Sequence, residues 1–454
     1  MVEEKAAMTT AGVAFPDEKG WLERLLAPIA DVRRGEAISA LLMTLTMFLI
    51  LFAYYLLKTA REVFILAEGG AEVKSYSSAG QALLLLGLVP AYGKLASSVN
   101  RIQLIQWVTL FFVANLAVFM LALSTGLRIG IVYFLWVGIF NVMVIAQFWA
   151  FANDLYTQEQ GKRLFPLIGV GSSLGAWMGS LRAGDVVATS GPLRLLSGGA
   201  FLLVACIVLA RLIDRTTRRE APAQAQHADE KLESGPNGFA MIGADRYLML
   251  IAALVVVLNI VNTSGEYLFG RYVVSAAAAA YGAGPESEAA RQQFIGNTYS
   301  SFFSYVNLFG FLMQMFVVSR VFKFLGVGKA LFVHPIVALG GYLMMLTVPS
   351  FNAIRWLKIA DNSLDYSLGN TTRQALWLPT SREAKYKAKQ AVDSFCQRAG
   401  DVLQAGIVYL STLLAFGIPA FAVLNIIFAG GWLAVAAGLN RGLRMKAQAG
   451  NGQL

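Results

Sequence analysis

Three charged residues interrupt one of the most apolar parts of the chain. Residues 37–57 contain no charge, Lys58, Arg61 and Glu62 then follow within five residues, and apolar sequence resumes at Val63. A charged side chain at the centre of a lipid bilayer costs at least about 2.5 kcal/mol, so these residues are expected to face a water-filled space. Two cations beside one acid leave a surplus of positive charge, which suits carboxylate or phosphate ligands. The segment therefore predicts an anion-binding cavity.

The composition indicates what kind of protein positions these charges. The 454 residues are 57% hydrophobic and only 14% charged, with a mean hydropathy of +0.58. Soluble proteins carry nearer a quarter of charged residues. Apolar stretches of about 20 residues recur along the chain, and each is long enough to cross about 30 Å of hydrocarbon. The chain is therefore expected to be an all-α integral membrane protein surrounded by the lipid bilayer.

Twelve apolar segments predict twelve transmembrane helices in two six-helix halves. They fall at 37–66, 76–96, 103–123, 129–152, 164–188, 193–213, 246–270, 296–319, 328–348, 352–378, 391–415 and 418–438. A polar stretch after the sixth segment is typical of a flexible linker. Basic connections recur at corresponding positions of the two halves, which favours the major facilitator superfamily fold.

The expected domains follow from this division. They are a cytoplasmic N-terminal segment with a short amphipathic helix (1–35), a six-helix bundle (36–213), a cytoplasmic linker (214–245), a second bundle (246–438) and a cytoplasmic tail (439–454). We expect the protein in the inner (cytoplasmic) membrane of the cell. Lys and Arg concentrate in the connections that follow even-numbered spans, so these connections and both termini are expected on the cytoplasmic side. The same loops account for the net charge of +10, and no nucleic-acid partner is expected. A monomer is expected.

Polar residues concentrate in the first, fourth, seventh and tenth spans, which line the central cavity in the major facilitator architecture. The candidate substrate-binding residues are Lys58, Arg61, Asn141, Asn153, Asn262, Arg271, Lys358 and Arg373. The candidate charge-balancing or coupling residues are Glu62, Glu266, Asp361 and Asp365. In the tenth span, one helical face carries Lys358, Asp361 and Asp365, and this face must meet water or another polar helix.

Ion pairs that merely hold helices together are the alternative interpretation of these charges. Lys58 and Glu62 are four residues apart and could pair within one helix. The eleventh span carries Arg398 and Asp401 at similar spacing, and for that span the structural interpretation is equally good. In the fifth span, glycines at four-residue intervals predict close helix packing; they are Gly171, Gly175 and Gly179.

Motifs for catalysis are missing from the sequence. It contains no HExxH, no GxSxG, no phosphate-binding GxxxxGK[ST] loop and no cluster of metal-ligand residues. We therefore expect no enzymatic activity, no catalytic residue, no metal and no cofactor.

Three stretches resemble a known family. They are YYLLKTAREV (54–63), FWAFANDLYTQEQGKRLFPLIGVGSSLG (148–175) and DYSLGNTTRQALWLPTSREAKYKAKQAVD (365–393). They are similar to the Tlc-type ADP,ATP carriers of plastids and intracellular bacteria. The resemblance implies nucleotide transport, by exchange of ATP for ADP or, as in some relatives, with protons. Arg61 matches the family's basic residue late in the first span. The family's acids of the fourth and seventh spans fall at Val137 and Asn262, neither of which is acidic, and Glu266 follows one turn later.

The sequence leaves three functions open. The first is a nucleotide transporter that works by alternating access, as an exchanger or a proton-coupled symporter. The second keeps the mechanism and changes the cargo to another organic or phosphorylated anion. The third is a membrane sensor or partner subunit that transports nothing, which a cavity with fully paired charges would favour.

Overall fold

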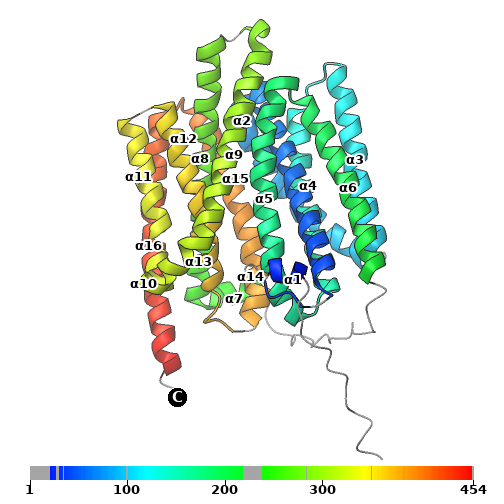
Figure 1. Cartoon of the computed structure of the whole chain (residues 1–454). Helices are drawn as coiled ribbons and strands as arrows, with labels where there is room; N and C mark the ends of the chain where they lie inside the picture. The colour runs from blue at the N-terminus through cyan, green and yellow to red at the C-terminus, as the bar shows by residue number, and fades with distance from the viewer. Residues whose placement is uncertain are drawn as a thin grey trace, which may run out of the picture.

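The computed structural model describes residues 21–26, 30–33, 35–98, 101–217, 238–282, 284–348, 350–381 and 383–451. Within these residues the regular secondary structure is entirely helical. Seven helices are long and apolar enough to cross a membrane, or eight if a bent pair of helices counts as one span. Figure 1 shows the long helices running side by side, with α1 and the end of α16 at the same end of the bundle.

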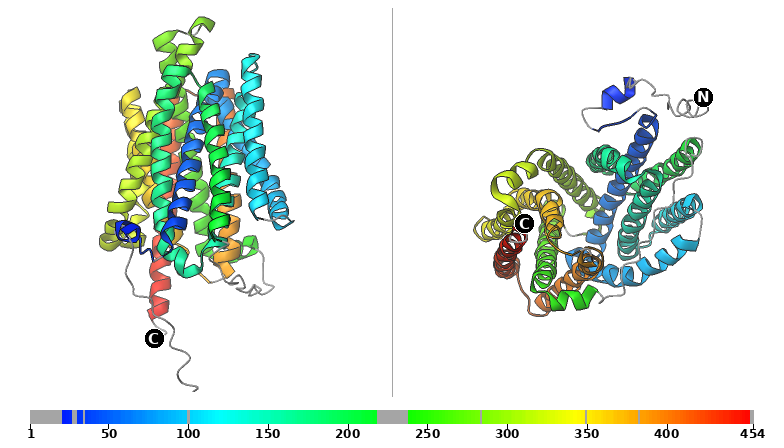
Figure 2. Two further views of the ribbon diagram at one scale, coloured as in Figure 1. Left: turned by 45° about the vertical axis from the view of Figure 1, so that its right-hand side comes forward. Right: turned by 90° about the horizontal axis from the view of Figure 1, so that it is seen from below.

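The first half of the chain forms six helices. They are α1 (Trp21–Leu26), α2 (Ala37–Ser98), α3 (Arg101–Ser124), α4 (Gly130–Leu155), α5 (Gln158–Ser190) and α6 (Leu193–Thr217). Helix α2 packs against α4, α5 and α6, and α3 packs against α6. Figure 2 shows this group on one side of the molecule when it is viewed along the helices.

The second half is built of shorter and more interrupted helices. They are α7 (Gly238–Ala244), α8 (Arg246–Tyr281), α9 (Glu288–Phe316), α10 (Val318–Ala330), α11 (Val333–Thr347), α12 (Phe351–Leu364), α13 (Asn370–Ala375), α14 (Lys389–Ala391), α15 (Gln397–Leu413) and α16 (Ile418–Asn451). A 3-10 turn (Pro285–Ser287) precedes α9, and π-helical turns lie at Asp365–Gly369, Ala384–Ala388 and Val392–Cys396. All twelve predicted spans fall on helical segments. The count of long helices is lower because α2 contains the first two spans, and because those from the ninth to the eleventh are short or interrupted.

Helix α2 folds back on itself at a glycine. Gly70 has φ 71° and ψ −170°, a conformation that residues with a side chain rarely adopt. Lys74 Nζ lies 2.7 Å from Glu62 Oε2, although residues twelve apart in a straight helix are separated by about 18 Å. The chain therefore reverses at Gly70, and the two arms of α2 are the first and second predicted spans.

The outer surface is apolar, as the membrane assignment requires. Leu121 on α3, Phe201 on α6 and Ile427 on α16 are large apolar side chains that are all more than half exposed. Monomeric soluble proteins rarely expose broad apolar patches. The chain is thus a multi-pass membrane protein whose outer helices meet lipid.

The two groups of helices meet along α2, α5, α9 and α15. Ser300 Oγ of α9 donates a hydrogen bond to the Ser180 carbonyl of α5 at 2.6 Å. Ser75 Oγ, on the second arm of α2, donates to Gln404 Oε1 of α15. The interface between the two groups is therefore partly polar, which suits a binding site.

The predicted glycine seam of α5 is confirmed. A methyl group added at Gly171 or Gly179 would lie 2.6 Å from the carbonyl oxygen of Thr44 or Phe52 on α2, and one at Gly175 would meet the Phe48 carbonyl even more closely. The seam therefore lets the backbones of α5 and α2 touch, which is how membrane helices use small residues.

Replacing Gly175 by alanine should destabilise the protein by about 1–3 kcal/mol, because overpacking a tight contact forces the two backbones apart. Thermal unfolding of the purified variant in detergent measures the effect. Gly169→Ala is the matched control, since a methyl group there meets nothing within 4 Å on the same helix. Equal stability of the two variants would contradict this account of the seam.

Candidate functional site

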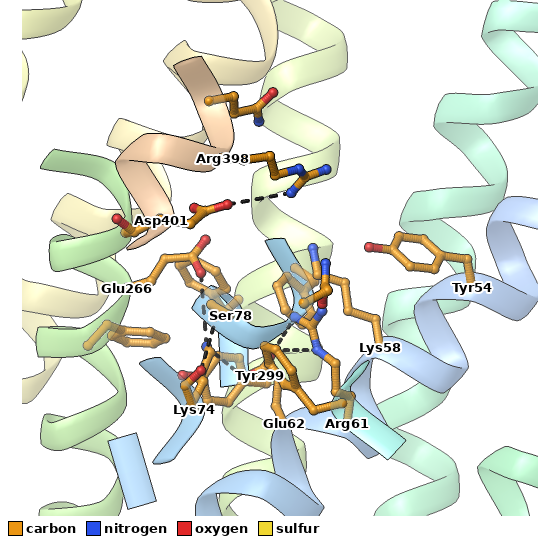
Figure 3. Close-up of a pocket in the computed structure, with 17 residues that line it drawn as sticks. Tyr54, Lys58, Arg61, Glu62, Lys74, Ser78, Glu266, Tyr299, Arg398 and Asp401 are labelled. Carbon is orange, nitrogen blue, oxygen red and sulfur yellow. Dashed lines mark hydrogen bonds and ion pairs between the residues drawn. The ribbon is translucent and has the colours of Figure 1, made fainter. Parts of the chain in front are cut away.

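A cavity of about 250 Å³ lies between the two groups of helices and is lined by α2, α4, α8, α9 and α15. Seven charged side chains border it (Figure 3). The four cations are Lys58, Arg61, Lys74 and Arg398, and the three acids are Glu62, Glu266 and Asp401. With all seven groups ionised, the lining carries one surplus positive charge. We call this space the central cavity.

Glu62 organises the cations of α2. Its side chain is fully buried and accepts hydrogen bonds from the Arg61 guanidinium, with Nε at 3.1 Å, and pairs with Lys74 Nζ at 2.7 Å. Lys74 also lies 4.0 Å from Glu266 on α8. Burying a charge is costly unless it is paired. Glu62 therefore holds Arg61 and Lys74 at the wall of the central cavity. It does not pair with Lys58, although the four-residue spacing would allow that pair.

Lys58 carries the surplus charge. Its ammonium lies 4.2 Å from the centre of the Phe303 ring and 5.1 Å from that of Tyr55. Among the described residues no carboxylate lies within ion-pair distance of it. Cation–π contacts stabilise an ammonium only in part and leave its hydrogen-bond donors unused. Lys58 is therefore a buried cation ready to accept an anionic partner.

Opposite Lys58, α15 contributes a pair of its own. Arg398 Nη1 lies 3.5 Å from Asp401 Oδ2, and Asp401 Oδ1 accepts a 2.7 Å hydrogen bond from Asn259 Nδ2 of α8. The carboxylate thus ties α15 to α8, while the guanidinium lies at the cavity wall.

A second cavity of about 100 Å³ lies between α8, α15 and the segment around α13. Asp365 and Arg373 border it and form an ion pair of 2.7 Å. Asn262 is also part of its lining. Gln397 lines both this cavity and the central one, so the two spaces adjoin at α15.

The structure divides the predicted site residues into separate places. Lys58, Arg61, Glu62 and Glu266 line the central cavity. Asn262, Asp365 and Arg373 line the second cavity.

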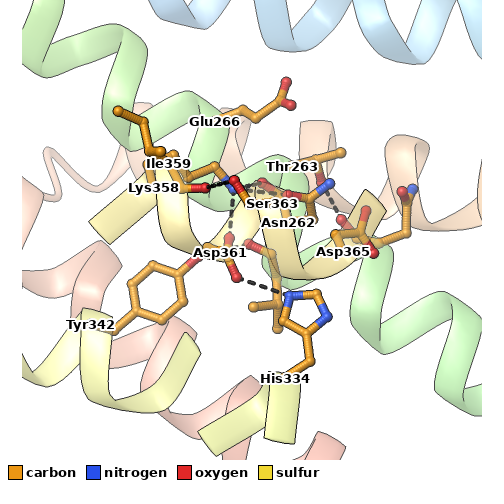
Figure 4. A network of polar contacts seen from close by, with 12 residues as sticks. Asn262, Thr263, Glu266, His334, Tyr342, Lys358, Ile359, Asp361, Ser363 and Asp365 are labelled. Atoms are coloured by element: carbon orange, nitrogen blue, oxygen red, sulfur yellow. Dashed lines mark hydrogen bonds and ion pairs between the residues drawn. The ribbon is translucent and has the colours of Figure 1, made fainter. Parts of the chain in front are cut away.

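The remaining candidates line neither cavity. Lys358 and Asp361 lie in a buried network with His334 (Figure 4). Arg271 lies 3.6 Å from Glu72 on the second arm of α2. Asn141 and Asn153 lie on α4, away from both spaces. The polar face of the tenth span therefore meets α8 and α11 at Lys358 and Asp361 and borders the second cavity at Asp365, and none of it lines the central cavity.

The candidate set from the sequence lacks three of the charged residues that line the central cavity. Lys74 falls in a connection between predicted spans, because its approach to Glu62 depends on the reversal at Gly70. The pair of Gly69 and Gly70 is the available signal of a tight turn. The spacing of Arg398 and Asp401 fits an ion pair that holds helices together as well as it fits a functional site. The available signal for them is the polar stretch within the otherwise apolar eleventh span.

Comparison with known proteins gives a family match and several distant relatives. The sequence model of the TLC ATP/ADP transporter family matches residues 17–125. The chain is 23% identical to ADP,ATP carrier protein 1 of Chlamydia pneumoniae over 66% of this chain and 64% of that protein. It is 23% identical to ADP,ATP carrier protein 4 of Rickettsia conorii over 88% and 89%, and 22% identical to the plastidic ATP/ADP transporter of Solanum tuberosum over 87% and 71%. The chain thus spans slightly less than two thirds of the chlamydial relative.

Solved structures of transporters share the fold. A bacterial homologue of the lysosomal transporter Spinster superposes with a TM-score of 0.60 at 12% identity, covering 91% of this chain and 99% of that one. The nucleoside transporter NupG superposes with a TM-score of 0.59 at 13% identity, covering 87% and 98%. At such identities the likeness concerns the fold alone. It supports the predicted arrangement of twelve spans in two halves, the major facilitator fold.

The family match lies on the part of the chain that builds most of the cavity. Residues 17–125 include both arms of α2, with Lys58, Arg61, Glu62 and Lys74. The relatives from bacteria and a plastid extend the similarity over most of the remaining chain. By these matches the chain is similar to the Tlc-type ADP,ATP carrier proteins, and its fold is one that solved membrane transporters share.

Proposed function

We propose that this protein transports nucleotides across a membrane by alternating access, with the central cavity as its substrate site. The observation that carries the proposal is Lys58, which no carboxylate of the described residues pairs and which gives the cavity between the two groups of helices one surplus positive charge. Relatives named ADP,ATP carrier proteins make a nucleotide the first anion to test.

Each charged residue then has a role. Lys58 binds an oxygen of the phosphate chain, and Arg61 offers the guanidinium nitrogens that Glu62 leaves free, since arginine forks match phosphate geometry. Arg398 approaches the substrate from the other half of the molecule. Tyr54, which lines the cavity, is a candidate to stack against the base. Gln397 borders both cavities, so the second cavity adjoins the proposed substrate site.

Ion pairs that join the two halves provide the moving parts. Lys74 of α2 lies near Glu266 of α8, and Glu72 of α2 lies near Arg271 of α8. Both pairs are at least 3.6 Å long, so they can separate at moderate cost when the halves rock apart. An entering anion would draw the cations toward itself and loosen the hold of α2 on α8.

Uptake into proteoliposomes tests the proposal. Labelled ATP and ADP should accumulate, and internal unlabelled nucleotide should accelerate uptake if the protein is an exchanger. Vesicles that contain the Lys58→Met variant provide the background. Absence of uptake for every nucleotide, with folded protein in the vesicles, would refute the proposal.

The size of the cavity favours one second candidate. A volume of about 250 Å³ is small beside the range of about 300–1,000 Å³ that holds drug-sized ligands. A smaller phosphorylated or organic anion would fit it without any opening of the halves. Competition of unlabelled phosphorylated anions with labelled ATP separates the two candidates, because a transporter of smaller anions would be inhibited by them at lower concentration.

The setting of the protein in the cell is also part of the proposal. We place it as a monomer in the cytoplasmic membrane of a bacterial cell, with both termini in the cytoplasm. The basic connections predicted to be cytoplasmic support this orientation, and α1 and the end of α16 lie at one end of the bundle. The bundle boundaries at 36–213 and 246–438 belong to the same proposal.

A further inference from the structure

A buried network around His334 plays no part in the anion site. His334 Nε2 of α11 lies 3.0 Å from Asp361 Oδ1 of α12, and Asp361 Oδ2 lies 2.8 Å from Lys358 Nζ. Lys358 Nζ also donates a hydrogen bond to Asn262 Oδ1 of α8 at 2.8 Å. All three ionisable side chains are buried (Figure 4). Ionisable groups inside a membrane carry a considerable energetic cost, which makes each of them a candidate for function.

One nitrogen of this network has no hydrogen-bond partner among the residues that the structure describes. This is His334 Nδ1, which is buried, while the edge of the ring contacts Trp432 with centroids 4.7 Å apart. Lys358 already balances the charge of Asp361, so a neutral His334 leaves the network uncharged. A neutral imidazole that donates from Nε2 to Asp361 carries a lone pair on Nδ1. Nδ1 is therefore a vacant position for one proton.

A glycine keeps open the space beside this nitrogen. A methyl group added at Gly369 would lie 3.0 Å from His334 Nδ1 and 3.4 Å from Asp365 Oδ1, so both atoms lie beside the position that a side chain would take; we call this position the gap at Gly369. Asp365 also lines the second cavity together with Arg373. Gly369 closes a π-helical turn, a rare conformation that is frequent at functional sites. Gly369 thus lies between His334 Nδ1 and a carboxylate that borders the second cavity.

We infer that His334 is a proton-binding site, loaded through Asp365 and the gap at Gly369, whose protonation drives transport. The inference rests on the proposed transport function and names its coupling ion. On loading, a hydronium ion in the second cavity gives its proton to Nδ1 by way of Asp365 and leaves water. His334 becomes an imidazolium, and the charge of the network rises by one. On release the same proton returns to water.

The proton signal reaches the central cavity through Lys358. With His334 charged, Asp361 is shared between two cations and holds Lys358 less strongly. Lys358 Nζ rests against the backbone of α8, where a methyl group at Gly265 would lie 3.1 Å from it. The next residue, Glu266, lines the central cavity beside Lys74. A change in Lys358 therefore alters the electrostatic balance at the substrate site.

The titratable and charged groups around His334 come from several helices. They are Tyr342 on α11, Lys358 and Asp361 on α12, Asp365 on the π-helical turn, Arg373 on α13 and Glu266 on α8. Tyr342 donates its hydroxyl to the Val261 carbonyl at 2.8 Å, and Arg373 pairs with Asp365. Trp432 of α16 contributes only its ring. These groups are engaged, which leaves Nδ1 of His334 as the vacant position.

Transport in His334→Gln proteoliposomes tests the inference. Glutamine retains an amide donor for Asp361 but binds no proton at neutral pH. In wild-type vesicles an inward proton gradient of one pH unit should support about tenfold accumulation of labelled nucleotide per proton carried. The variant should lose this accumulation and retain nucleotide exchange at equal pH. A variant that still accumulates nucleotide on a pH gradient, or a wild-type protein that ignores the gradient, overturns the inference while leaving the proposed function intact.

Closing the gap provides a matched pair of variants. Gly369→Ala should block the connection between Asp365 and Nδ1 and abolish accumulation driven by pH. Gly340→Ala lies on the same helix as His334 and adds a methyl group that meets nothing within 4 Å, so it should behave as wild type. Gradient-driven uptake by Gly369→Ala equal to that of Gly340→Ala would contradict the proposed route.

A measurement without substrate separates this inference from the proposed function. The chain contains two histidines, His227 and His334. In a His227→Asn background, NMR of histidine labelled in the imidazole ring observes His334 alone in detergent. We expect its ring to gain a proton as the pH of the sample is lowered, and to do so differently in Gly369→Ala. A ring that stays neutral while the protein remains folded refutes the site, whether or not any nucleotide is transported.

Discussion

A Lys58→Met variant should bind and take up the transported nucleotide about 10- to 150-fold more weakly than the wild type, which corresponds to the roughly 1.5–3 kcal/mol of one hydrogen bond to a charged group. Lys58 is the cation that no carboxylate among the described residues balances, so its loss removes the surplus charge of the central cavity. Methionine keeps the apolar stem that packs beside Phe303 and thereby preserves the local fold. Binding of labelled ATP to detergent-purified protein, followed by uptake into vesicles, measures the effect.

Lys323→Met provides the control for this prediction. Lys323 lies on α10 with its ammonium 5.9 Å from the Phe324 ring, so it repeats the lysine–aromatic contact at a distance from either cavity. Its replacement should leave binding and uptake unchanged. Lys58→Arg should retain part of the affinity, because it preserves the charge with a bulkier head group. If Lys58→Met bound ATP as well as Lys323→Met does, the surplus charge would have no role in recognition.

The amino-acid sequence is sufficient to predict the spans and one corner of the site. Stretches of 20 apolar residues are dictated by membrane thickness, so the helices can be located from hydropathy alone. Charges within such stretches are expensive, and for that reason Lys58, Arg61 and Glu62 stand out from their apolar surroundings. Glu266 joins them in the central cavity because the seventh span lies beside the first.

The pairing of the charges cannot be predicted in the same way. Helical periodicity places Lys358 and Asp361 on one face, but periodicity cannot tell whether a polar face meets water or another helix. The structure turns that face toward His334 and Asn262. Lys74 illustrates the same limit, since its pairing depends on a chain reversal whose geometry only the folded molecule reveals.

Replacing Glu62 by glutamine should cause a large loss of stability, of about 3–5 kcal/mol, because it removes one partner of a buried ion pair and leaves the other charges uncompensated. Glu62 is fully buried, and the Arg61 and Lys74 side chains that it holds are only 12% and 8% exposed. Thermal unfolding in detergent should show the loss directly. Glu159→Gln removes an acid from the exposed pair with Arg33 and should cost no more than about 1 kcal/mol.

The double variant Glu62→Gln with Lys74→Met decides whether the loss comes from charge. Glu62→Gln alone leaves two cations, Arg61 and Lys74, without their buried acid. The double variant leaves only Arg61 in that position, so it should be more stable than Glu62→Gln. A positive coupling between the two changes is the expected outcome of a double-mutant cycle on residues in direct contact. If the two losses simply added, the packing of the Glu62 side chain, and not its charge, would be what stabilises the hairpin of α2. Coupling of the expected sign would establish that the charge of a buried acid holds the cations of the central cavity in place.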